Sequence, residues 1–364
     1  MSPFLWVLVA VVGILIPVTI YDLVQKKHAI LRNFPIIGHF RYLLEAVGPE
    51  LRQYIVTNNN EERPFSRDQR RWVYASAKKQ NNYFGFGTDE NIELDPNFII
   101  IKHSAFAPPQ EPANNGPPVS ERRSYSFPVA DQRGYALPCA KVMGGPRGRA
   151  KAFRPTSIVN VSGMSYGSLS AAAVEAMNRG AGLAGCLQNT GEGGVSPYHQ
   201  HGGDLIWQIG TGYFGCCSEA GVFSRERFLE TVAANSSIKA VEIKMSQGAK
   251  PGLGGMLPAA KVSPEIARIR GVPEGKDVIS PSHHSAFGNV DELLDFVEDL
   301  SEGSGLPIGI KSAVGQDGFW RDLARAMASG ERGVDFIAID GGEGGTGAAP
   351  LVFSDHVALP FKLA

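Results

Sequence analysis

The sequence predicts an α/β fold of the TIM type, a (β/α)8 barrel, and three observations support this. From about residue 157 onward, short apolar runs alternate with segments whose apolar residues recur at helical spacing, which is typical of a parallel sheet. Each predicted strand ends in a polar or glycine-rich loop. Glycine accounts for 43 of the 364 residues and gathers in these loops. A ring of such loops predicts one site at the carboxyl end of a barrel.

The first residues form an apolar segment long enough to cross a bilayer. Residues 4–20 carry no charge, and the apolar stretch continues to Val24 with Tyr21 and Asp22 as polar interruptions. This is near the minimum of about 17 residues for a membrane span. Basic residues follow the run, whereas a cleaved signal peptide carries them before it. They are Lys26, Lys27, Arg32 and Arg41. We therefore expect residues 1–25 to be a transmembrane anchor, with the catalytic part in the cytoplasm; a buried core helix is the alternative.

Residues 26–127 are predicted to be an N-terminal cytoplasmic segment that precedes a barrel at residues 128–364. Apolar residues at helical spacing within 43–55 predict either an amphipathic helix near the membrane surface or a packed helix with one solvated face. Residues 98–101 hint at a short strand. Residues 105–118 are rich in Pro and Asn, which is typical of a linker or of an arm over the catalytic part.

Within the barrel we expect six strands, each followed by a loop and most by a helix. The predicted strands are 157–162, 185–189, 205–209, 238–245, 307–311 and 335–340. The predicted helices are 168–183, 226–234, one that starts at 264, 290–300 and 320–328. Ser168 or Ser170 is expected to cap the first helix. Since this fold closes with eight strands, the incomplete barrel predicts a C-terminally truncated chain that aggregates or binds its cofactor poorly.

A glycine-rich run follows the last predicted strand. Five glycines lie within residues 341–347, and such density lets backbone amides approach a ligand closely. Gly342, Gly344 and Gly347 match a dinucleotide fingerprint, but residues 348–350 are Ala-Ala-Pro and do not open a helix as that motif requires. We therefore reject a dinucleotide site here; a glycine loop without any ligand is the alternative.

Composition excludes several classes of function. Charges are nearly balanced, with 35 basic and 36 acidic residues, so we expect no nucleic-acid partner. The cysteines form no C-x-x-C pair, and the adjacent His283 and His284 lack ligand spacing, so we expect no metal site. The four cysteines are Cys139, Cys186, Cys216 and Cys217.

Two strand ends carry the same pattern, Ile-Lys, at Lys244 and Lys311. A lysine at the carboxyl tip of a barrel strand is expected to point over the site, where it can stabilise the negative charge of a reduced isoalloxazine ring. Gln188, Asn189 and Gln247 offer paired donors and acceptors for the edge of a planar heterocycle. The sequence shows no nucleophile or acid–base constellation, which favours a cofactor that carries the chemistry.

Seven segments closely resemble the FMN-binding synthase domain of glutamate synthases, and most closely its stand-alone members of the archaeal or membrane-linked type. The resemblance covers about residues 157–361. The segments are SGMSYG (162–167), QNTGEGG (188–194), WQIGTGYFG (207–215), EIKMSQGAKPGLGG (242–255), LPAAKV (257–262), SPSHH (280–284) and DGGEGGTGAAP (340–350).

The resemblance implies an FMN-linked TIM barrel that reduces 2-iminoglutarate, formed from 2-oxoglutarate and ammonia, to L-glutamate. It implies that the flavin contacts Ser162, Met164, Ser165, Gln188, Lys244, Lys311, Asp340, Gly341 and Gly342. It implies that the substrate contacts Ser165, Gly167, Glu192, Lys250 and Arg270. Lys250 and Arg270 suit the two carboxylates of this substrate, and Glu192 would lie near the imine nitrogen. Glu192 and Lys250 are therefore the expected catalytic residues.

The chain departs from the family pattern in ways that leave alternatives open. Met256 stands where the long members have Gln, which leaves the substrate open. No cysteine follows Met1, so ammonia is expected from outside the chain. Electrons are expected from a donor such as ferredoxin or a reductase, and an iron–sulfur cluster only in a missing C-terminal part. The alternatives are an FMN oxidoreductase with another substrate and a non-catalytic membrane-tethered fragment.

Overall fold

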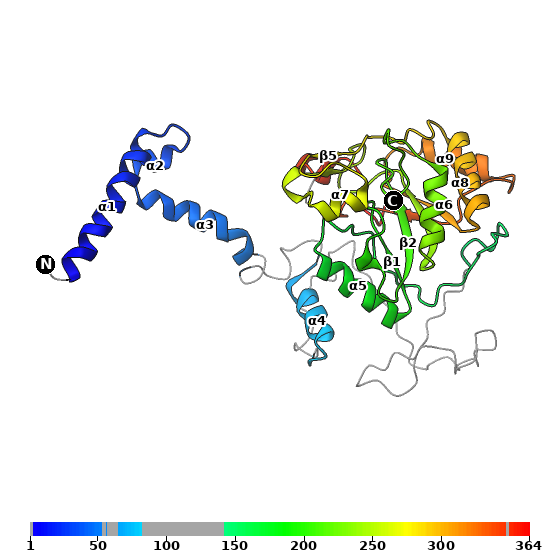
Figure 1. Ribbon diagram of the computed structural model, residues 1–364, viewed down its shortest axis with the longest axis horizontal. Helices are drawn as coiled ribbons and strands as arrows, with labels where there is room; N and C mark the ends of the chain where they lie inside the picture. The colour runs from blue at the N-terminus through cyan, green and yellow to red at the C-terminus, as the bar shows by residue number, and fades with distance from the viewer. Residues whose placement is uncertain (1–2, 53–55, 57–64, 82–141, 347–348) are drawn as a thin grey trace. The chain divides into compact units, whose positions relative to one another are not determined.

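The computed structural model describes residues 3–52, 56, 65–81, 142–346 and 349–364. The chain divides into two compact units, residues 1–102 and 103–364 (Figure 1). The short strand predicted at 98–101 and the linker predicted at 105–118 lie outside the described residues.

The described residues of the first unit form four α-helices. They are α1 (Pro3–Val24), α2 (Ala29–Asn33), α3 (Ile37–Leu51) and α4 (Arg67–Ala77). The stretch Phe4–Val24 has a mean hydropathy of 2.5, so by length and composition α1 can cross a membrane, a property that signal sequences and core helices share. The amphipathic segment predicted within 43–55 is part of α3. A capping box between Ser66 and Gln69 fixes the start of α4.

The second unit is built on a curled parallel sheet of five strands, a half-barrel (Figure 1). In spatial order the strands are β1 (Leu187–Asn189), β2 (Asp204–Ile209), β3 (Ile238–Lys244), β6 (Ile308–Ser312) and β7 (Ile337–Ile339). Five of the predicted strands are thus confirmed, and their sequence order equals their spatial order. This arrangement is consistent with part of a TIM barrel.

The strand predicted at 157–162 is wrong. Val161 alone forms a parallel bridge, to Gln188 at the edge of β1. Next to it, the side-chain oxygen of Asn160 accepts the Leu187 N–H at 2.9 Å and takes the place of a ladder bond. Ser157 accepts the Val159 N–H at 3.0 Å and bends the chain. Side chain–backbone bonds of this kind compete with strand pairing, so the segment pairs with β1 at Val161 alone and does not form a strand.

Five of the described helices of the second unit follow the predicted order, and a sixth, α10, was not predicted: it begins directly after Pro350, where no helix was expected. They are α5 (Ala171–Ala184), α6 (Arg225–Ala234), α7 (Pro264–Arg270), α8 (Val290–Ser304), α9 (Gly318–Met327) and α10 (Leu351–His356). Of the two serines considered as the cap of α5, Ser170 is the one that accepts the Ala173 N–H. The antiparallel pair of β4 (Met256–Leu257) and β5 (Val278–Ile279), which are connected through α7, was not predicted, because two-residue strands show no alternation.

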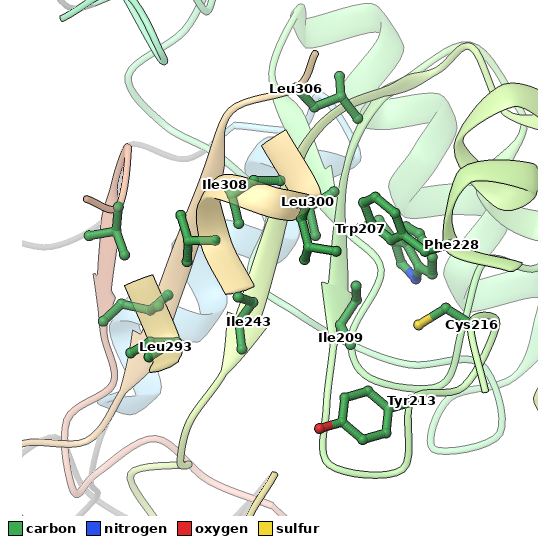
Figure 2. Close-up of a cluster of buried hydrophobic side chains, with 14 of the residues drawn as sticks. Trp207, Ile209, Tyr213, Cys216, Phe228, Ile243, Leu293, Leu300, Leu306 and Ile308 are labelled. Atoms are coloured by element: carbon green, nitrogen blue, oxygen red, sulfur yellow. The ribbon is translucent and has the colours of Figure 1, made fainter. Parts of the chain in front are cut away.

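Helices cover the outer face of the sheet and create the main core. Helix α5 packs on β1 and β2, and α8 packs on β6. Figure 2 shows Trp207 and Phe228 stacked, with ring centroids 5.4 Å apart, near the strand residues Ile209 and Ile243. All of these side chains are buried. Because side chains alternate along a strand, the residues between them point to the inner face.

The inner face begins with an apolar layer at the amino ends of the strands. Leu187, Ile206 and Ala240 form a buried cluster against Phe336, and Met143 and Phe153 pack on it. A Cβ on Gly309 would approach the Phe336 ring to 2.6 Å, so a glycine is needed for that ring to lie inside. The polar residues of the site stand above this layer, towards the carboxyl ends.

Candidate active site at the carboxyl ends of the strands

A buried polar layer separates the apolar floor from the loops. Glu242 of β3 accepts hydrogen bonds through one carboxylate oxygen from Asn189 of β1 at 2.8 Å and from Gln208 of β2 at 2.6 Å. All three side chains are buried. A Cβ on Gly163 would meet the Asn189 side-chain oxygen at 2.8 Å, so the loop after residue 162 lies directly on this layer.

From the sequence, Asn189 was expected to face the edge of a planar heterocycle, whereas Gln208 and Glu242 were not predicted to belong to the site. The signal was available, because Glu242 lies two residues before Lys244 and therefore shares its face of β3.

The two lysines predicted to point over the site stand side by side. Lys244 and Lys311 are register partners on β3 and β6. Lys244 forms an ion pair with Glu192 at 2.9 Å and donates to the Gln247 side-chain oxygen at 3.1 Å. Lys311 lies 3.3 Å from the carboxylate of Asp340, which also accepts the Gly248 N–H at 2.9 Å. Both predicted lysines thus belong to one polar cluster.

Glu192 is the central anion of this cluster. Its side chain packs against Gly210, the residue that follows β2, so closely that a Cβ there would clash with the carboxylate. Burial acts to raise the pKa of Glu192, but the charges of Lys244, Lys250 and Arg270 hold it below its ordinary value. Glu192 is therefore ionised at neutral pH.

The two cations assigned to the substrate are buried. Lys250 is 4% exposed and donates to the Gly254 carbonyl at 2.9 Å. Burial lowers its pKa, and the charge of Glu192 opposes that shift. Arg270 donates to the Tyr166 carbonyl at 3.1 Å, and its guanidinium carbon lies 5.1 Å from the centre of the Phe214 ring. Burial also lowers the pKa of Arg270.

Arg270 retains an unused donor. Its Nε is buried and has no hydrogen-bond partner among the described residues. Buried donors are normally paired, so an orphaned guanidinium N–H suggests an absent acceptor such as a carboxylate. Three positive charges, those of Lys244, Lys250 and Arg270, act on the single negative charge of Glu192. The cluster therefore suits an anionic ligand.

The loop at residues 162–167 brings two predicted substrate residues beside Arg270. Ser165 is buried, and its hydroxyl is 3.0 Å from that of Ser168. Gly167 has a φ of 99°, in the region that favours glycine, and a Cβ there would lie 3.3 Å from the guanidinium of Arg270. Met164 is half-buried and Ser162 is exposed in this loop.

One predicted flavin residue has its side chain elsewhere. The Gln188 side chain accepts from Asn178 of α5 at 2.8 Å, on the helix-covered face of the sheet. Its backbone still lies at the end of β1. By contrast, the turn at 340–342 meets the loop after β3 so closely that a Cβ on Gly248 would collide with the Gly341 carbonyl. Asp340, Gly341 and Gly342 therefore lie at the site.

A histidine–tyrosine pair holds the tip of β3. His284 lies 2.9 Å through Nε2 from the Lys244 carbonyl and 3.1 Å through Nδ1 from the Tyr213 hydroxyl. The Lys244 carbonyl can only accept, so Nε2–H donates to it, and Nδ1 of the neutral ring then accepts from the Tyr213 hydroxyl, which itself accepts the Ala286 N–H at 3.1 Å. Burial lowers the pKa of His284, which favours this neutral form. Sequence reasoning weighed His284 only as a metal ligand. The described residues contain no cluster of His, Cys, Asp or Glu suited to a metal ion.

The donor set fits the flavin that the resemblance implies. Lys244 and Lys311 place two ammonium groups at neighbouring strand tips, and Gln247 adds an amide beside them. Glycines bring backbone close on two sides: Gly341 lies against the loop after β3, and Gly163 lies against Asn189 and Gln208. Ammonium, amide and backbone N–H groups are the donors that complement the acceptor atoms of an isoalloxazine ring.

Comparisons with known proteins place the same region in one family. The family model described as a conserved region in glutamate synthase matches residues 145–364. The glutamate synthase large subunit-like protein YerD of Bacillus subtilis is 38% identical, over 97% of this chain and 71% of its own length. An archaeal glutamate synthase [NADPH] of Methanocaldococcus jannaschii is 36% identical over 57% of this chain, and an archaeal-type glutamate synthase [NADPH] of Thermotoga maritima likewise. The chain spans 38% of the length of each of these last two relatives.

Proposed function

This chain belongs to the glutamate synthase family of oxidoreductases, which act on CH–NH2 donor groups, and from that premise we propose that it forms L-glutamate. The proposed reaction takes 2-oxoglutarate and ammonia to 2-iminoglutarate and reduces the imine with FMN as cofactor. The single observation that carries the proposal is that Lys244, Lys250 and Arg270 converge on Glu192 while the buried Nε of Arg270 has no hydrogen-bond partner among the described residues.

A dicarboxylate substrate matches two of these buried cations. We assign one carboxylate of 2-oxoglutarate to Arg270, whose buried Nε lacks a partner in the described chain, and the other to Lys250. Arg binds a carboxylate as a fork, while Lys acts as a point charge. Ser165 and Gly167 line the Arg270 side of the site. Burial strengthens both contacts because it lowers the effective dielectric around them.

Glu192 is proposed to hold the nitrogen of the imine. Its carboxylate is ionised next to Lys244, so it accepts a hydrogen bond from a protonated imine nitrogen and keeps the proton at that atom. Protonation at nitrogen makes the imine carbon a better hydride acceptor. Reduced FMN would supply the hydride when bound, and the electron donor would reduce the flavin again. Lys244, Lys311, Ser162, Met164, Ser165 and the 340–342 turn would hold it, with Gln188 contributing through its backbone.

We propose that α1 anchors the chain in a membrane, with residues 26–127 and the barrel from residue 128 on the cytoplasmic side. The apolar stretch and the basic residues after it support this orientation. Electrons would come from a donor such as ferredoxin or a reductase, and ammonia from solution. The family also suggests iron–sulfur clusters, for which we assign no residue in this chain.

Met256 favours a second candidate, a substrate other than 2-oxoglutarate. It is 55% exposed at the start of β4, next to Gly255, where a Cβ would lie 3.1 Å from the Glu192 carboxylate. Met256 can therefore reach a ligand that contacts Glu192, and an apolar thioether there favours a less polar substrate than Gln would.

Calorimetric titration of the full-length, FMN-loaded protein tests the proposal. We expect 2-oxoglutarate to bind at least about tenfold more tightly than 2-oxobutyrate, which lacks the second carboxylate. Tighter binding of 2-oxobutyrate would favour the alternative substrate class. A protein that neither retains FMN on desalting nor binds either oxoacid would support the non-catalytic fragment and overturn the proposal.

A further inference from the structure

Helix α3 carries an apolar face that no described residue covers. Its six large apolar side chains are between 40% and 76% exposed and recur every three or four residues, so they share one side of the helix. They are Ile37, Phe40, Leu43, Leu44, Val47 and Leu51. An exposed apolar stripe of this length marks an interaction surface.

The opposite side of α3 is held against the rest of the first unit. Gly38 lies on Leu31 of α2, where a Cβ would come within 2.9 Å of the leucine side chain. Tyr42 packs edge-on against His28, with ring centroids 5.0 Å apart. His39 lies against Asp22 of α1. The apolar face therefore points away from α2.

Asp22 forms the joint between α1 and α3. Its side chain is fully buried, accepts the Ile36 N–H at 2.9 Å and lies 2.9 Å from Nε2 of His39. A carboxylate inside an otherwise apolar helix is costly unless it is paired, so this arrangement has a specific structural use. Because Asp22 lies in the last turn of α1, the contact fixes the start of α3 at the level where α1 ends (Figure 1).

The level at which α1 ends is that of a membrane surface. An apolar helix of 21 residues is about 31 Å long, close to the thickness of about 30 Å of a bilayer's hydrocarbon core. Lys26, Lys27 and Arg32 follow Asp22, and no acidic residue occurs before Glu45, which forms an ion pair with Arg41. The positive charge of residues 26–32 complements anionic lipid headgroups.

We infer that α3 lies in the membrane surface as an interfacial helix, with its apolar face in the boundary between headgroups and acyl chains and its start locked to α1 by the Asp22–His39 contact. The inference rests on the proposed anchoring by α1. We prefer a bilayer to a second copy of the chain as the partner of this face. The end of α1, the basic residues 26–32 and the start of the apolar face lie at one level.

Photo-crosslinking of the full-length protein tests the inference in liposomes of phosphatidylcholine that contain phosphatidylglycerol. p-Benzoylphenylalanine replaces Leu44 on the apolar face, Ala46 on the other side of α3 as a matched control, or Ile14 within α1. We expect lipid adducts at positions 14 and 44, and at least about fivefold less adduct at 46. Adding His39→Ala should lower the yield at 44 without changing that at 14, and His39→Gln, which keeps a donor, should restore it.

The contrary outcomes are distinct. Lipid adduct at 14 together with none at 44, or equal yields at 44 and 46, overturns the interfacial helix and leaves the anchor in place. A protein–protein adduct between two copies at 44 assigns the face to a second chain and also overturns the inference. No lipid adduct at either 14 or 44 overturns the interfacial helix and the anchor together.

Discussion

At the scale of single residues, the site is set by charges that burial makes strong. Lys244, Lys250 and Arg270 keep Glu192 ionised, and burial works against the charges of Lys250 and Arg270 in the absence of a further anion. Bringing charged groups into such a site costs stability, which a bound dianion would offset. We therefore expect the cluster to serve a ligand rather than the stability of the empty fold.

Lys250→Met separates these two roles. We expect the Kd for 2-oxoglutarate to rise by about 10- to 100-fold, because one charge-assisted hydrogen bond is lost. The thermal unfolding temperature should change little, since burial already opposes the charged form of Lys250. Lys261→Met, at an exposed lysine, is the control and should leave both values unchanged. A large loss of stability with unchanged affinity would assign Lys250 a structural role instead.

Buried histidine gives the fold a defined sensitivity to acid. His199 is fully buried, and its Nδ1 lies 2.8 Å from the Ser196 hydroxyl. Burial lowers its pKa to about 4. The unfolded chain takes up a proton near pH 6.5 while the folded chain does not, so stability is intact above pH 6.5 and falls between pH 6.5 and 4.

His199→Gln should remove this component. Urea unfolding at pH 7.5, 5.5 and 4 should show a loss for the natural protein that is larger than for the variant by roughly 3 kcal/mol at most. The lowered pKa of His284 adds the same acid sensitivity to both proteins, so its contribution cancels in the comparison. Parallel pH profiles for the two proteins would show that folding does not shift the pKa of His199.

At the scale of elements, the features that could be predicted from the sequence are those that depend on apolar periodicity and on the residues at strand ends. The five strands from residue 187 onward, their helices and the placement of Lys244 and Lys311 follow from apolar runs that end in loops. The segment at 157–162 failed because Asn160 and Ser157 bond to nearby backbone groups, and periodicity carries no information about that. The side chain of Gln188 turned to α5 for a similar reason: Asn178 supplies a partner there.

A buried ion cluster ties the start of β7 to the rest of the barrel. Arg149 pairs with Asp335 at 3.0 Å, with Glu298 of α8, and donates to the Gly333 carbonyl at 3.1 Å. Burial raises the pKa of Asp335, although Arg149 and the Ile308 N–H act in the opposite direction. Arg149 is thus the counterion for two carboxylates of separate elements.

Arg149→Met should therefore destabilise the fold by about 3–5 kcal/mol at pH 7, because it leaves buried carboxylates unpaired. The loss should shrink as the pH falls, since a protonated Asp335 no longer needs a counterion. Arg225→Met breaks an ion pair with Asp299 whose partners are both 45% exposed, and should cost about 1 kcal/mol or less. Equal losses in the two variants, by chemical denaturation, would mean that the cluster contributes no more than a surface pair.

At the scale of the whole molecule, two units have different physical tasks. Residues 1–102 hold the apolar helix α1 and the exposed face of α3, while residues 103–364 hold the half-barrel and its charged cluster. Among the described residues, every side chain that we assign to the cluster belongs to residues 103–364. We therefore expect membrane attachment and catalysis to be separable properties, with the first unit deciding where the reaction takes place.

The most direct measurement of the central claim is a single turnover of the FMN-loaded protein. The flavin is reduced without oxygen, and its absorbance is followed after mixing with 2-oxoglutarate, with ammonium, or with both. The account predicts rapid reoxidation only with both substrates, and about one L-glutamate formed per flavin, because the hydride has a single destination. No reoxidation with both substrates, or reoxidation without L-glutamate, would contradict it.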